Sequence, residues 1–74
     1  MARQGEKWSK KEEGCLIISY LIEKDNIFTL SRIMGRTKVA IVLRLKKLRV
    51  IREVYEARGF SELESYDKSK LNNH

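Results

Sequence analysis

The chain has 74 residues, with 16 lysines and arginines against 10 acidic residues and a formal net charge of +6. This length suits a single small domain, and one cysteine excludes an intramolecular disulfide. One cysteine and one histidine fall short of the about four ligands of a structural zinc site, and no apolar run approaches the ~18 residues of a membrane span. We therefore expect a soluble, cytoplasmic protein with no metal and no cofactor.

The N-terminal part predicts an arm followed by a helix. Residues 1–8 are polar and lack periodicity, so we expect a mobile arm there. Ser9 and Glu12 have the S-x-x-E spacing of a capping box, and the apolar residues that follow recur at helical spacing. The first helix is expected over about 10–24. Its buried residues are expected to include Leu16, Tyr20 and Cys15.

Two further helices are expected after an Asp-Asn break. The second spans 29–34, begins at Thr29 and ends at Gly35, because glycine tolerates the left-handed conformation of a helix stop. Thr37 then caps a third helix that begins at Lys38. The residues expected to face the core are Leu30, Ile33 and Met34 on the second helix and Ile41, Leu45 and Leu48 on the third.

The rest of the chain leaves alternatives open. Residues 50–58 favour an extension of the third helix, although their strand-forming side chains also suit a short winged hairpin. Residues 59–74 are polar and are expected to form a frayed tail, with one short helix where Ser61 and Glu64 repeat the capping-box spacing. The expected domain is an all-α, three-helix bundle over 9–58, between the arm and this tail.

The positive charge is concentrated in one part of the chain. Residues 31–58 hold six arginines and three lysines against two glutamates, a net charge of +7, while the other segments nearly cancel. A basic segment of this kind attracts polyanions. Its expected nucleic-acid contacts are Arg36, Lys38, Lys46, Lys47 and Arg49.

A short helix, a glycine-containing turn and a basic helix, in this order, indicate a helix-turn-helix. The motifs that support this are Trp8-Ser9, Glu12-Glu13, Leu16, Gly35-Arg36-Thr37 and Arg44-Leu45. With them, the chain resembles the Myb/SANT-like family of DNA-binding domains over about residues 7–48. The resemblance implies a three-helix fold with Trp8 at the first of three core positions that are aromatic in the family. Ile27 and Leu45 stand at the other two and depart from the family pattern.

The outer face of the third helix differs from that of a protein that reads bases. Base edges are read by Arg, Asn or Gln, whereas Val39, Val42 and Leu43 occupy the centre of this face. The cations that flank them suit phosphates. An apolar centre with a basic rim also suits a protein partner. Alternatively, these three side chains belong to the core, under the C-terminal segment.

The small size, the arm and the order of helices also resemble small phage-encoded transcription regulators that bind host RNA polymerase. This resemblance implies contacts with the large polymerase subunits that inhibit initiation or promote antitermination. The expected partner-binding residues are Arg3 and Lys7 on the arm and Val39, Val42 and Leu43 on the third helix.

The alternative function is direct binding of duplex DNA, or of nascent RNA, through the basic third helix. We expect a monomer. No arrangement of Ser, His, Cys or carboxylate side chains in the sequence supports an enzyme, so we expect a non-catalytic protein.

Overall fold

Side-chain caps set where the helices begin. In the computed structural model, which describes residues 7–71, Ser9 Oγ accepts a hydrogen bond from the Glu12 N–H at 3.0 Å. The Glu12 carboxylate accepts one from the Ser9 N–H at 3.3 Å, which completes the predicted capping box. Helix α1 spans Lys10–Leu21, so it begins where predicted and ends about one turn earlier.

Helix α2 spans Ile27–Met34 and begins earlier than predicted. Its cap is Asn26 rather than Thr29, because the Asn26 side chain accepts a hydrogen bond from the Thr29 N–H at 3.0 Å. Gly35 has a left-handed φ of 68° and ends the helix, as predicted. The turn that follows is short, so α3 starts close to the end of α2.

Helix α3 spans Lys38–Lys47 and is capped, as predicted, by the Thr37 hydroxyl. It does not continue through residues 50–58. Arg49 has a left-handed φ of 62°, and the N–H groups of residues 50 and 51 both donate to the Leu45 carbonyl, which turns the chain. The predicted extension is therefore wrong, and no strand of a winged hairpin occurs within residues 7–71. Two short 3₁₀ helices follow instead, η1 (Val54–Glu56) and η2 (Phe60–Glu62).

A further helix, α4, spans Ser65–Leu71, where a frayed tail was predicted. It begins after Glu64, whose carbonyl accepts from the Lys68 N–H, rather than at Ser61. Leu71 is only 2% exposed and anchors the helix to the core. On the outer side of α4, a side-chain hydrogen bond with Tyr66 raises the pKa of Lys70.

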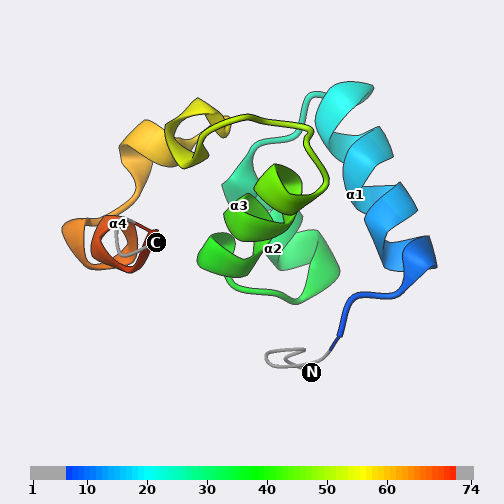
Figure 1. The fold of residues 1–74 in the computed structure, drawn as a ribbon, viewed down its shortest axis with the longest axis horizontal. Coiled ribbons are helices and arrows are strands. Elements are labelled where there is room, and N and C mark those ends of the chain that lie inside the picture. Colours follow the sequence, from blue (N-terminus) through cyan, green and yellow to red (C-terminus); the bar gives the residue numbers. More distant parts are fainter. Residues whose placement is uncertain (1–6, 72–74) are drawn as a thin grey trace.

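The described residues are all-helical, as predicted, but they form four α-helices where a three-helix bundle was expected. Figure 1 shows α2 and α3 at the centre, α1 along one side, and the C-terminal segment with α4 on the other. Helix α3 contacts both α2 and α4, so it lies between the N-terminal and C-terminal parts. The core therefore extends past residue 58 and includes side chains of the predicted tail.

The core is formed by apolar side chains from all four α-helices and from the segment between α3 and α4. Its buried members are Leu16, Tyr20, Ile27, Leu30, Ile41, Val42, Leu45, Ile51, Ala57, Leu63 and Leu71. Two predictions of burial are wrong, because Ile33 is 63% exposed and Cys15 is exposed as well. Both lie on sides of α1 and α2 that no other described element covers.

Candidate nucleic-acid interface

Arg36 is one of the few polar side chains inside the protein. It is 4% exposed, and its Nε and Nη2 each lie 2.9 Å from an oxygen of the Glu12 carboxylate. Its Nη2 also donates to the Lys7 carbonyl, and the guanidinium lies 4.3 Å from the centroid of the Trp8 ring. The structure therefore places Arg36, a predicted nucleic-acid contact, inside the protein, where its donors join the start of α3 to the start of α1.

Two other arginines of the basic segment also have structural partners. Arg44 Nη1 lies 3.1 Å from Glu13 Oε2 and joins α3 to α1. Arg58 Nη1 donates to the carbonyls of Tyr20 and Asp25 at 3.0 and 2.7 Å, and its N–H donates to Tyr20 Oη. The positive charge available for an external partner is therefore smaller than the sequence suggests.

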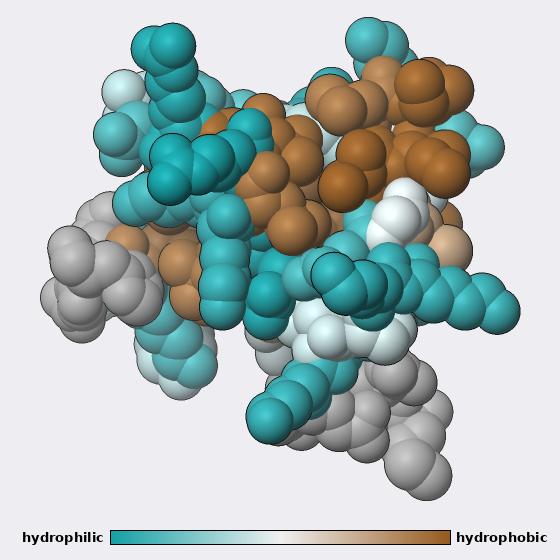
Figure 2. Space-filling model, turned by 45° about the vertical axis from the view of Figure 1, so that its right-hand side comes forward, coloured by the Kyte–Doolittle hydropathy of each residue, from teal (hydrophilic) through white to brown (hydrophobic). Residues whose placement is uncertain are grey.

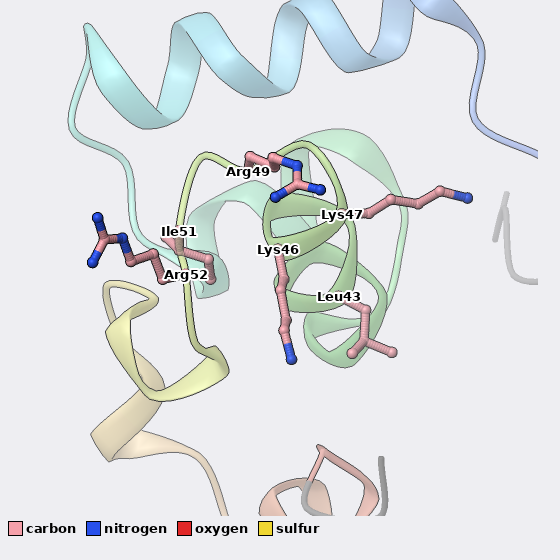
Figure 3. A pocket seen from close by; sticks show the side chains of 6 residues that line it. All are labelled: Leu43, Lys46, Lys47, Arg49, Ile51 and Arg52. Atoms are coloured by element: carbon pink, nitrogen blue, oxygen red, sulfur yellow. The ribbon is translucent and has the colours of Figure 1, made fainter.

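Four of the remaining cations gather where α3 ends. A hollow of about 590 Å³ lies at this point. Figure 3 shows Lys46 and Lys47 extending from α3 in different directions. Arg49 and Arg52 come from the segment that turns back after the helix. The residues that line the hollow are Leu43, Lys46, Lys47, Arg49, Ile51 and Arg52. We call this surface the basic hollow.

The backbone explains why these cations meet. The left-handed conformation of Arg49 reverses the chain, and Ile51, which is buried, holds the reversed segment against the core. Arg49 and Arg52 therefore flank the buried Ile51, which keeps both of them close to the end of α3. A non-glycine residue in this conformation costs about 1–2 kcal/mol, so the position carries an arginine at a cost in stability.

The four cations are exposed and are not neutralised by neighbours. Within residues 7–71, no side-chain hydrogen bond or ion pair involves Lys46, Lys47, Arg49 or Arg52. The Glu56 carboxylate lies near but accepts a hydrogen bond from the Arg52 backbone N–H, at 2.9 Å, rather than from its guanidinium. The basic hollow is thus a concentration of unpaired positive charge, which suits an anion with several charges.

The other predicted site residues lie elsewhere. Lys38 is half-buried at the opposite end of α3, with its Nζ 5.3 Å from the centroid of the Phe28 ring. Lys7 is exposed, and Arg3 lies outside the described residues, as does most of the predicted arm.

The apolar centre predicted on α3 is not an exposed surface. Val42, a predicted partner-binding residue, has no exposed area and packs in the core, as the alternative interpretation of this face expected. Val39 and Leu43 are half-buried against that core. The C-terminal segment contributes to the cover of this helix, because α4 and η1 both contact α3.

Sequence patterns locate most of the basic hollow but not all of it. Lys46, Lys47 and Arg49 were predicted nucleic-acid contacts, and the structure brings them together. Arg52 was missed because an extended α3 would have carried it a full turn further along the helix. The signal that could have found it is the buried Ile51, an apolar residue between two arginines.

No family model matches the chain, and no curated protein and no solved structure matches it. Within residues 7–71, no helix is long and apolar enough to cross a membrane. The same residues contain no group of three or more His, Cys, Asp or Glu side chains placed to hold a metal ion.

Proposed function

We propose that the protein is a non-catalytic regulator that binds duplex DNA through the phosphate backbone at the basic hollow. The observation that carries this proposal is the set of four exposed, unpaired cations around one hollow: Lys46, Lys47, Arg49 and Arg52. DNA presents closely spaced phosphates, and neutralising them releases counterions, which favours binding.

The order of α2, the Gly35 turn and α3 supports a helix-turn-helix assignment, in which α3 lies against the DNA. In such motifs the N-terminal part of the second helix contacts base edges. Here that part begins with Lys38, which is half-buried beside Phe28, and the free cations lie at the opposite end. We therefore expect the protein to contact phosphates rather than bases, and to show little preference for DNA sequence.

Salt dependence of DNA affinity tests the proposal. Four phosphate contacts predict a slope of about −3.6 in log affinity against log salt, because each contributes about −0.9. Two duplexes of unrelated sequence should bind with similar affinity. A slope near zero, or no binding at low salt, would contradict the proposal.

A pair of double variants separates the site from net charge. Lys46→Gln with Lys47→Gln should reduce the slope by about 1.8, since two phosphate contacts are lost. The control, Lys24→Gln with Lys70→Gln, removes the same charge from exposed positions outside the basic hollow. Equal losses in both double variants would mean that overall charge, rather than this surface, governs binding.

A second function is docking on the large subunits of bacterial RNA polymerase. The observation that favours it is Leu43, which brings apolar surface into the basic hollow beside Lys46 and Lys47. Mixed apolar and basic surfaces suit protein partners. Binding of purified polymerase core enzyme, in the presence and absence of excess duplex, distinguishes the two functions. If the protein docks on polymerase, Leu43→Asp should abolish polymerase binding, and excess duplex should not compete with it.

A further inference from the structure

The side of α1 that faces away from the core carries an exposed stripe. It consists of Lys11, Cys15, Ile18 and Ile22, at spacings of four, three and four residues. Ile18 is 56% exposed and Ile22 is 72% exposed, although isoleucine is usually buried. Figure 2 brings the α1 side forward and shows apolar side chains gathered at the upper right of that view, among hydrophilic ones. Spacings of this kind are those of the contact positions of paired helices.

A hollow lies beside this stripe, between α1 and α2. Its volume is about 450 Å³. Its lining is Ser9, Lys11, Glu12, Cys15, Ile33 and Met34. Ile33 is among the most exposed apolar side chains of the described residues, so the hollow has an apolar side that no described element covers. The stripe thus has a protruding end at Ile22 and a hollowed end near Lys11.

We propose that two copies of this chain pair through α1, antiparallel about a two-fold axis, with Ile22 of each copy seated in the α1–α2 hollow of the other. In an antiparallel pair with these spacings, residue 22 lies opposite residue 11, and residue 18 lies opposite residue 15. The protruding end of each stripe then meets the hollowed end of the other. A two-fold axis makes both contacts identical, as expected for a homodimer.

The charges along α1 select the antiparallel arrangement. Lys10 and Lys11 are exposed at its N-terminal end. Glu23, Lys24 and Asp25 follow its C-terminal end and together carry a net charge of −1. Antiparallel pairing brings lysine toward glutamate and also opposes the two helix dipoles. Parallel pairing would set Lys11 against its own copy, which is unfavourable.

Gly14 provides an independent observation. Glycine inside a helix costs about 1 kcal/mol relative to alanine, yet a Cβ at Gly14 would meet nothing within 4 Å. No contact inside the described chain therefore requires glycine here. A second helix packed beside the Cys15–Ile18 part of the stripe would approach α1 more closely at a residue without a side chain.

Sedimentation equilibrium under reducing conditions tests the proposal, over about a hundredfold range of protein concentration. The wild-type protein should pass from monomer to dimer as concentration rises, and Ile22→Asp should stay monomeric. The matched control is Tyr55→Asp, which changes a side chain of similar exposure (67%) on η1 and should dimerise like the wild type. Circular dichroism of each variant should match the wild type, because both side chains are exposed.

Cross-linking locates the contact. Cys15 is the single cysteine and is exposed, and in the proposed dimer the two thiols lie near the two-fold axis. A short bismaleimide should give a covalent dimer with the wild type and with Tyr55→Asp, but not with Ile22→Asp. A monomer at every concentration would overturn the proposal and would assign the stripe to another protein. A dimer that Ile22→Asp leaves intact would overturn it too.

Discussion

The backbone N–H of Arg58 donates a hydrogen bond to Tyr20 Oη at 2.9 Å, and the Arg58 guanidinium lies 4.2 Å from the centroid of the same ring. The two residues are 38 positions apart. The Arg58 carbonyl also accepts from the Ile27 N–H at 3.0 Å. Arg58 therefore joins α1, the start of α2 and the C-terminal segment at one point.

Removing the Tyr20 hydroxyl tests how much its hydrogen bond with the Arg58 N–H contributes to stability. Tyr20→Phe should lower the free energy of unfolding by about 1–2 kcal/mol, because the Arg58 N–H loses its partner in a part-buried place. Urea unfolding followed by circular dichroism measures the change. Tyr55→Phe, at an exposed ring, is the control and should change the value by less than about 0.5 kcal/mol.

A substitution at Val42 tests whether this side chain belongs to the core or to a docking surface. Val42→Ala should lower the free energy of unfolding by about 2 kcal/mol, because a fully buried side chain loses two methyl groups. DNA affinity of the folded protein should stay unchanged. Leu43→Ala, at a half-buried position, should cost clearly less. Unchanged stability with a loss of polymerase binding would instead assign Val42 to an interface.

Arg49 and Lys24 form a matched pair for separating stability from binding. Both have left-handed backbone, with φ of 62° and 64°. Replacing either by glycine should raise the free energy of unfolding by about 1 kcal/mol, since the strain on a side-chain-bearing residue is removed. Only Arg49→Gly should weaken DNA binding, because Lys24 does not line the basic hollow. Similar losses of affinity in both variants would argue against a localised site.

Gly14 and Gly59 should respond in opposite ways to the same substitution. In dilute solution, Gly14→Ala should raise the free energy of unfolding by up to about 1 kcal/mol, because the helix gains propensity and the space is open. Gly59→Ala should lower it by at least about 1 kcal/mol, because φ there is +100° and a Cβ would lie 3.2 Å from Ile27 Cγ1. At high concentration, Gly14→Ala should also weaken the proposed self-association.

The elements that depend on neighbouring residues could be predicted from the sequence. Ser9 and Thr37 cap the helices expected of them, and Gly35 ends α2, because capping and left-handed turns are decided within a few residues. The turn at Arg49 could not be predicted this way. Nothing local marks an arginine for left-handed backbone, and the buried Ile51 that holds the turn in place acts through tertiary packing.

In the candidate site, too, features set by neighbouring residues could be predicted, whereas features set by tertiary contacts could not. Lys46 and Lys47 could be assigned because the charge run of α3 is local. Arg36 could not be excluded, since its partner Glu12 lies 24 residues away. The stripe on α1 was missed for a related reason: Ile18 and Ile22 resemble core residues until the packing of the other helices shows that nothing described covers them.

The burial of Leu63 and Leu71 has a consequence for the newly made chain. Domains often begin to fold as they leave the ribosome, N-terminal part first. Here helices α1 to α3 emerge while the side chains that close the core over α3 have not yet been joined to the chain. Until Leu71 has been synthesised, α4 cannot pack on α3, so the core around α3 closes only after the ribosome has passed residue 71.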